Sequence, residues 1–205
     1  NALRIMEKFS EISGHPEDTK LFSLLARTAE KSFIETFWLE QEKYLADTVY
    51  NNEKDRTLRP NQIITLALPF EVLDTNKAKL IIKIVREKLL TPFGLRTLPQ
   101  EDRRYHSKYE GDQPLRDIAY HQGTVWNWLL GSYIEAILRY EGSSGREEAK
   151  ELLSTAEENL TKCCFGSISE IFDGELPHNP RGAIAQAWSI GETLRSIENL
   201  ELSEK

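Results

Sequence analysis

The 205-residue chain contains only two cysteines, no long apolar run and no excess of basic side chains. Cys163 and Cys164 are adjacent, so they form neither a loop-closing disulfide framework nor a spaced pair of metal ligands. The 26 basic and 33 acidic residues give a net charge of −7, which argues against a nucleic-acid-binding module, because phosphate contacts need a basic surface. No segment approaches the roughly 20 apolar residues of a membrane helix, and the N-terminus lacks a signal-peptide layout. We therefore expect a cytoplasmic protein without nucleic-acid or membrane partners.

What the chain does contain is typical of a globular protein, with 40% hydrophobic and 29% charged residues. Its length fits one domain or a large piece of one. Asn1 and Ala2 precede an amphipathic segment without an initiator methionine. We interpret these two residues as the remnant of an expression tag, and residues 3–205 as a piece of a longer polypeptide.

Apolar residues recur at spacings of three and four in several segments, which is the pattern of amphipathic helices. This pattern predicts helices within residues 3–12, 18–38, 63–68, 74–90, 123–140, 147–164 and 183–200. The helix at 18–38 is expected to bury one face, and Ser144 and Glu147 have the spacing of a capping box. Residues 44–55 indicate a short hairpin or an extended loop. Strand signals are few, so the sequence predicts an all-α fold of stacked helical hairpins.

Two polar segments, residues 93–121 and 166–182, lack periodicity and are longer than the roughly 12–15 residues of an ordinary connection. Both combine aromatic rings with polar side chains. Sugars present apolar C–H faces and a rim of hydroxyls, so this combination suits a sugar-binding site. Trp126 and Trp128 lie two positions apart in a predicted helix, so we expect them to point to opposite sides and only one to face a ligand.

Five ordered motifs resemble those of one family, the glycogen debranching enzymes, in the C-terminal part of their amylo-α-1,6-glucosidase domain. The motifs are RPNQ at 59–62, TPFGLRTL at 91–98, YH and YEG at 105–111, AYHQGTVW at 119–126, and EIFDG with RGAIAQAW between 170 and 188. The similarity extends over nearly the whole chain after Leu3.

The resemblance implies an (α/α)6 toroid, of which about seven helices would supply roughly the C-terminal half. It also implies an inverting glucosidase that removes the single α-1,6-linked glucose from a branch point of glycogen or a limit dextrin. Inversion needs two carboxyl groups roughly 6.5–9.5 Å apart. Glu170 matches the family's general base, whereas the general acid is expected upstream of this chain. Alone, the chain should therefore lack activity and self-associate through its unclosed face.

The resemblance and the loop chemistry together give candidate substrate contacts: Asn61, Gln62, Arg96, Tyr120, His121, Gln122 and Trp126. Arg96 could bind a sugar hydroxyl or orient Glu170. Asn61 and Gln62 could instead cap a helix. Asp173, followed by glycine, reads as a turn residue, and the prolines beside His178 and Arg181 indicate a rigid turn. The four histidines are not paired at ligand spacing, so we expect neither a metal nor a cofactor.

Two other functions remain open. The chain could belong to another inverting hydrolase with the same toroid, such as a trehalase-like or mannosylglycerate-hydrolase-like enzyme. It could also be a non-catalytic helical module that binds glucan or another protein.

Overall fold

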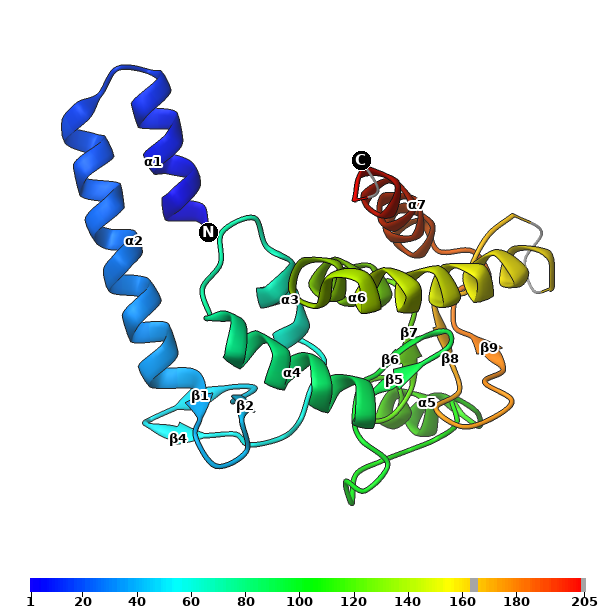
Figure 1. The fold of residues 1–205 in the computed structure, drawn as a ribbon. Coiled ribbons are helices and arrows are strands. Elements are labelled where there is room, and N and C mark those ends of the chain that lie inside the picture. Colours follow the sequence, from blue (N-terminus) through cyan, green and yellow to red (C-terminus); the bar gives the residue numbers. More distant parts are fainter. Residues whose placement is uncertain (163–165, 204–205) are drawn as a thin grey trace.

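The computed structural model describes residues 1–162 and 166–203, so the two cysteines lie outside the described residues. Within these ranges the helices are α1 (Ala2–Ile12), α2 (Pro16–Phe37), α3 (Gln62–Ala67), α4 (Thr75–Lys88), α5 (Gln113–Ala119), α6 (Leu129–Lys162) and α7 (Ala187–Leu202). Helices α1 and α2 form one antiparallel hairpin, and α7 packs along α6 (Figure 1). None of these described helices is long and apolar enough to cross a membrane. Each predicted helical segment overlaps an observed helix, whereas α5 lies in a segment predicted to be a loop.

Short strands occur mostly outside the predicted helices, but the strand at Val125–Trp126 lies within the predicted helix at 123–140. They are β1 (Trp38–Leu39), β2 (Tyr44–Leu45), β3 (Val49–Tyr50), β4 (Glu53–Lys54), β5 (Leu90–Thr91), β6 (Gly94–Arg96), β7 (Val125–Trp126), β8 (Ile171–Phe172) and β9 (Pro180–Arg181). Strands β5 to β9 pair in chain order as a five-stranded antiparallel sheet. This sheet brings the two long polar segments together on one side of the helices (Figure 1).

The hairpin alternative for residues 44–55 is confirmed by the pairing of β3 with β4. Asn51 and Asn52 form its turn with φ angles of 48° and 65°. Asparagine tolerates this left-handed region better than other non-glycine residues, and two such residues in a row suit the tight turn of a two-residue hairpin. The sequence Asn-Asn therefore fixes the turn locally.

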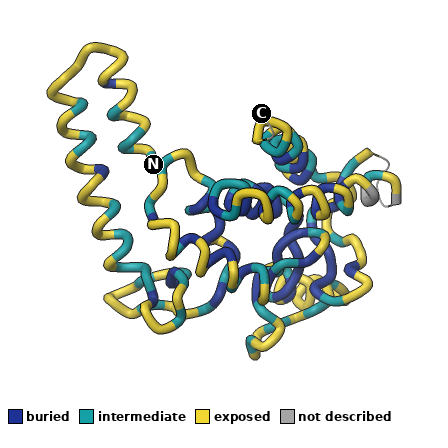
Figure 2. The backbone as a smooth tube through the Cα atoms, in the orientation of Figure 1, coloured by how far each residue is buried: buried dark blue, intermediate teal, exposed yellow. Residues whose placement is uncertain are grey.

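The main hydrophobic core lies between α3, α4 and α6 (Figure 2). Helix α4 begins at an N-cap, where the Asp74 carboxylate accepts a hydrogen bond of 2.9 Å from the backbone N–H of Lys77. Its apolar face, with Ile81, Ile82 and Val85 fully buried, packs against α6. The three-and-four spacing of these residues places them on one side of the helix, as the sequence predicts.

Helix α6 is interrupted at Gly142, whose φ of 61° and ψ of −125° are not helical. Glycine adopts this conformation without a steric penalty, and the break separates the two helices that the sequence predicts within this range. The predicted capping box is wrong: the Ser144 hydroxyl donates a 3.0 Å hydrogen bond to the Glu141 carbonyl. The first of the two helices also begins at Leu129, six residues after the predicted start, because the preceding residues are extended.

The α1–α2 hairpin extends away from the rest of the chain and is largely exposed (Figures 1 and 2). Helix α2 forms as predicted, but Ala26 is its only buried residue. Phe9 and Leu24 are each 57% exposed, and Ile12 is 83% exposed. The predicted buried face of α2 is thus wrong over most of its length, because α1 alone packs on this part of the helix.

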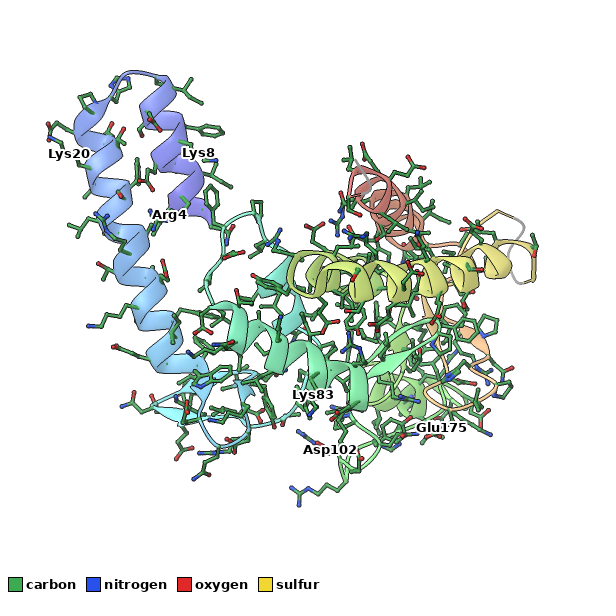
Figure 3. All side chains as sticks on the ribbon, in the orientation of Figure 1. Arg4, Lys8, Lys20, Lys83, Asp102 and Glu175 are labelled. Carbon is green, nitrogen blue, oxygen red and sulfur yellow. The ribbon has the colours of Figure 1, made fainter. Side chains whose placement is uncertain are left out.

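The base of α1 is attached to the segment between α3 and α4. The amide of Asn1 exchanges two hydrogen bonds, 3.0 and 2.9 Å long, with the backbone of Phe70. The Lys8 ammonium lies 4.9 Å from the centre of the Phe70 ring. Arg4, which is labelled in Figure 3, pairs with Glu7 on α1 and approaches Glu30 on α2. These polar contacts fix the hairpin at one end only.

Candidate active site

The candidate base, Glu170, lies immediately before β8, which pairs with β7 and β9 in the five-stranded sheet. The register pairs Trp126 of β7 with Ile171 of β8, so the residues that flank these two strands are brought side by side. The backbone N–H of Glu170 also donates a 3.0 Å hydrogen bond to the Ala183 carbonyl, just after β9. Glu170 is thereby positioned by two strands rather than by a free loop.

Two donors hold the Glu170 carboxylate. The Tyr120 hydroxyl donates to Oε1 at 2.6 Å, and the Ala183 backbone N–H donates to Oε2 at 2.9 Å. Burial, and next the hydrogen bond to Glu170, raise the pKa of the Tyr120 phenol well above its usual value. Tyr120 therefore remains a protonated donor at neutral pH. The half-buried carboxylate keeps one orientation, because each of its oxygens has a separate partner.

Aromatic rings surround the Tyr120 side of this carboxylate. The Tyr120 ring lies 4.7 Å from the His121 ring and 4.9 Å from the Trp126 ring, in edge contacts. His121 stacks on Trp126 with a centroid distance of 5.0 Å and an interplanar angle of 11°. Trp188 makes an edge contact with Trp126 and stacks on Trp128 at 5.3 Å. The cluster forms a continuous aromatic wall.

The prediction that Trp126 and Trp128 point to opposite sides is wrong. Trp126 belongs to β7, and α6 begins only at Leu129. In an extended segment, residues two positions apart point to the same face, whereas the prediction assumed a helix. Both rings consequently reach the same pocket and contact Trp188.

A pocket of about 480 Å³ opens in front of this wall. It is lined by aromatic and polar side chains together: Asp47, Arg59, Pro60, Asn61, Thr97, His121, Trp126, Trp128, Leu129 and Trp188. Glu170 is next to the pocket rather than in its lining, and Tyr120 connects the two through its hydroxyl and its ring. Among the described residues, no group of three or more His, Cys, Asp or Glu is arranged to hold a metal ion.

The predicted contacts Asn61 and Gln62 have different roles. Asn61 lines the pocket, and its side-chain amide donates to Asp47 at 3.0 Å. It precedes α3 but makes no side-chain cap, so that alternative is wrong. Gln62 is buried and binds backbone groups of Leu45 and Arg59, at 3.2 and 3.1 Å. Its amide therefore holds the backbone at Leu45 and Arg59 in place and does not face the pocket.

Arg96 and Gln122 also bind within the protein. The Arg96 guanidinium donates to the carbonyl of Gly174 at 2.8 Å, and Gln122 accepts from Arg59 at 3.0 Å. One alternative in the sequence analysis was that Arg96 orients Glu170. In the structure, Tyr120 and Ala183 make the contacts that orient this carboxylate. The predicted residues that line the pocket are thus Asn61, His121 and Trp126, with Tyr120 and Glu170 beside it.

The second polar segment is closed by an ion pair between the buried Asp173 and the half-buried Arg181. Asp173 is 2% exposed, and its carboxylate accepts hydrogen bonds of 3.0 Å from Arg181 Nε and 2.9 Å from Arg181 Nη2. It also accepts from the Tyr109 backbone N–H at 3.0 Å. The His178 ring lies 2.8 Å from the Asp173 carbonyl. These contacts agree with the predicted turn and tie both polar segments together.

Sequence reasoning selected only three of the ten lining residues as site residues, and missed Asp47, Arg59, Trp128 and Trp188 among others. Arg59 and Trp188 lie inside the motifs quoted above, so the motifs carried a signal for them. Asp47 follows β2 and reaches the pocket only because the β1–β2 hairpin folds back towards α3. No local pattern marks it.

Comparison with known proteins identifies the family. The family model described as amylo-alpha-1,6-glucosidase matches residues 1–195. The chain belongs to this family. A segment of 89 residues, 40% of this chain and 6% of the relative, is 35% identical to the glycogen debranching enzyme of Saccharomyces cerevisiae. The resemblance found in the motifs is therefore confirmed, and the family is one of glycoside hydrolases. The chain spans only a small part of the length of the yeast relative.

Solved structures show the same fold at low sequence identity. A mannosylglycerate hydrolase of family GH63 from Thermus thermophilus matches with a TM-score of 0.68 and 16% identity, over 97% of this chain and 42% of that one. The neutral trehalase of Saccharomyces cerevisiae matches with a TM-score of 0.63 and 11% identity, over 90% of this chain and 33% of the trehalase. The predicted fold class, helical hairpins forming part of an (α/α)6 toroid, is confirmed. The chain spans less than half of either structure.

Proposed function

We propose that this chain carries the base-bearing part of an inverting amylo-α-1,6-glucosidase that hydrolyses branch-point glucose in glycogen debranching. The observation that carries the proposal is the carboxylate of Glu170, fixed by Tyr120 and Ala183 beside an aromatic pocket, in a member of this family. A cytoplasmic location goes with this proposal, because the substrate would be the glycogen of the cell.

In the proposed mechanism, Glu170 is the general base. Each carboxylate oxygen has two lone pairs, and the donors Tyr120 and Ala183 occupy one on each oxygen, so a lone pair remains for water. Glu170 takes a proton from this water while the oxygen of the water attacks the anomeric carbon. The proton for the leaving oxygen comes from a second carboxyl group about 6.5–9.5 Å away. We expect that acid in the natural polypeptide that carries this chain, outside these 205 residues.

The pocket suits a glucose ring at the end of an α-glucan. The apolar faces of a pyranose pack on tryptophan rings such as Trp126 and Trp188, while its hydroxyls need directional partners. Asn61 and His121 offer such partners on the other walls. We therefore assign the substrate contacts to the lining residues, with Tyr120 acting through Glu170.

The substitution Glu170→Gln in the natural polypeptide tests this proposal. We expect kcat for glucose release from a limit dextrin to fall by several orders of magnitude, with KM nearly unchanged, because the amide cannot accept the proton. The matched control is Glu175→Gln in the same segment, since the Glu175 carboxylate accepts hydrogen bonds from Gln100 and Tyr105 and does not line the pocket. Full activity in Glu170→Gln would refute the assignment of the base.

The structural neighbours favour a second candidate, an inverting hydrolase for another glycoside. Assaying the natural polypeptide on a limit dextrin, trehalose and mannosylglycerate separates the two, and the anomer of the released sugar, followed by NMR, tests inversion. Binding of glucan without hydrolysis of any of these substrates, equally in Glu170→Gln, would instead indicate a non-catalytic binding module.

A further inference from the structure

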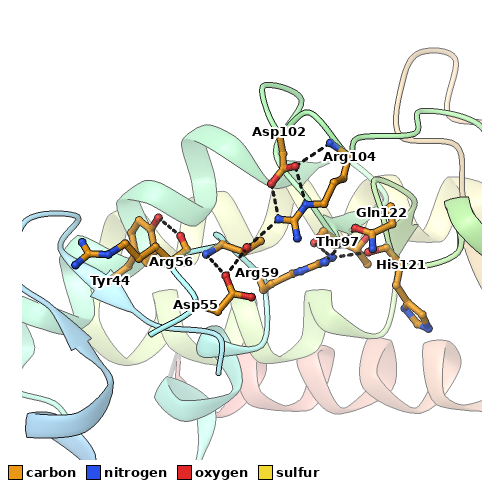
Figure 4. Close-up of polar contacts among 10 residues, drawn as sticks. Tyr44, Asp55, Arg56, Arg59, Thr97, Asp102, Arg104, His121 and Gln122 are labelled. Carbon is orange, nitrogen blue, oxygen red and sulfur yellow. Dashed lines mark hydrogen bonds and ion pairs between the residues drawn. The ribbon is translucent and has the colours of Figure 1, made fainter. Parts of the chain in front are cut away.

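Arg59 connects the start of α3 to the opposite wall of the candidate pocket (Figure 4). Its Nη1 donates to the carbonyl of Thr97 at 2.9 Å and also to the carbonyl of His121. Its Nη2 donates to the side-chain oxygen of Gln122 at 3.0 Å. Only the fixed fork of a guanidinium supplies several coplanar donors in this arrangement.

Thr97 also holds the segment that contains His121, but it binds Gly123 and Thr124 and not the His121 carbonyl. The Thr97 hydroxyl accepts from the Gly123 N–H at 2.8 Å, and the Thr97 N–H donates to the Thr124 carbonyl at 3.0 Å. Arg59 therefore fixes the peptide plane after His121. The direction of the His121 side chain depends on that plane, so Arg59 supports the parallel stacking of the imidazole on Trp126.

The charge of Arg59 is also directed at His121. The three acceptors of Arg59 are neutral, and its carboxylate neighbours Asp47, Asp55 and Asp102 act on it from farther away. A cation beside an imidazole disfavours a second positive charge on the ring.

Three influences act on the His121 ring. Burial and, next, the charge of Arg59 lower the pKa of His121, whereas Glu170 on the other side raises it. Of the remaining titratable neighbours, Tyr120 contacts the same ring and Asp47 lines the same pocket. At neutral pH the stacked imidazole is uncharged, so it can both donate and accept hydrogen bonds with a sugar hydroxyl.

We propose that Arg59 is a positioning residue that fixes the His121 ring against Trp126 at the pocket wall. The expected effect of Arg59 on catalysis rests on the proposed function. The effect of Arg59 on His121 does not rest on it and is measured separately.

The first measurement is the NMR titration of His121 in the 205-residue chain with ¹³C-labelled histidine, and the signal is assigned by its loss in His121→Asn. Arg59→Gln removes both the charge and the fork. We expect the His121 pKa to rise and the upfield shift of its ring signals, caused by stacking on Trp126, to diminish. Arg59→Lys keeps the charge but not the fork, so the pKa should stay while the upfield shift diminishes.

The control is Arg104→Gln. Arg104 belongs to the same polar cluster, but its side chain binds Asp102 and Thr57 and not the segment at His121 (Figure 4). The Arg104→Gln variant should leave both the His121 pKa and the upfield shift unchanged. The proposal is overturned if Arg59→Gln alters neither the pKa nor the upfield shift, or if the Lys and Gln variants alter both equally. Should the Gln variant not fold, an unchanged ring shift in Arg59→Lys overturns it.

The second measurement uses the natural polypeptide and a limit dextrin. Arg59→Lys should lower kcat/KM by up to about 100-fold, because a displaced contact in a binding site costs this much, and Arg104→Gln should not lower it. If His121 responds in the NMR experiment but the unsubstituted enzyme releases no glucose, the positioning role stands and the proposed function fails. If the enzyme is active and Arg59→Lys changes neither readout, the positioning role fails.

Discussion

At the scale of single residues, the position of the Glu170 carboxylate depends on the missing side chain of Gly182. A Cβ at residue 182 would lie 2.4 Å from Glu170 Oε2, and Gly182 has a φ of +68°. In Gly182→Ala we expect the carboxylate to be displaced from Tyr120 and Ala183. The free energy of unfolding, measured with urea, should fall by more than the roughly 1–2 kcal/mol that the left-handed backbone alone costs an alanine.

A matched glycine separates the two causes. Gly14 has a φ of +73°, and a Cβ there would meet no atom within 4 Å. Gly14→Ala therefore carries the backbone cost without the collision, and should leave kcat of the natural polypeptide unchanged while Gly182→Ala lowers it. Equal loss of stability and equal activity in the two variants would mean that Glu170 moves freely, against the fixed carboxylate described here.

At the scale of elements, a charged group joins α4 to both halves of α6. Arg86 Nη2 binds Glu148 at 2.7 Å, and the same guanidinium also binds Glu141. The Tyr133 hydroxyl donates to Glu148 at 2.6 Å. Since Glu141 and Glu148 lie on either side of the break at Gly142, Arg86 stabilises the bend of α6 as well as its contact with α4.

Replacing Arg86 with methionine should therefore leave two carboxylates facing each other in a partly buried place. We expect a loss of about 2–3 kcal/mol in the free energy of unfolding at pH 7. Lys83→Met on the exposed face of α4 is the control, with an expected change within about 0.5 kcal/mol. Equal urea midpoints for the two variants would contradict this.

The helices could be predicted from the sequence because their signal is local. The apolar residues of α4, for example, repeat within one segment and become its buried face. The sheet could not, because its strands have two or three residues each and are too short for an alternating pattern. Val125 and Trp126 are extended because β6 and β8 pair with them, and those partners lie about 30 and 45 residues away in sequence.

The candidate site was predictable to the extent that motifs marked it. Tyr120, His121 and Trp126 lie in one motif, and their contacts with one another are local. Arg59 meets this motif across 62 residues, through a backbone carbonyl, which any residue supplies, and through the side-chain amide of Gln122. Such a contact has no pattern of its own, so only the fold reveals it.

At the scale of the whole molecule, the apolar surface is unevenly distributed. The α1–α2 hairpin exposes Phe9, Ile12 and Leu24, and α7 exposes Leu194 and Leu202, at 61% and 57%. In Figure 2 the hairpin is mostly exposed, while the buried residues concentrate around α4 and α6. Large apolar side chains that lie together at one surface favour association, whereas isolated ones are common on monomers.

We therefore expect the 205-residue chain, studied alone, to self-associate through the hairpin. Light scattering after gel filtration should give a mass that rises with protein concentration. Sulfate should strengthen the association, because it favours apolar burial, whereas ionic contacts weaken with salt. Phe9→Glu combined with Leu24→Glu should restore the monomer, and Lys20→Glu, an exposed change on the same hairpin, should not. A constant monomer mass at all concentrations would show that these exposed residues form no associating surface.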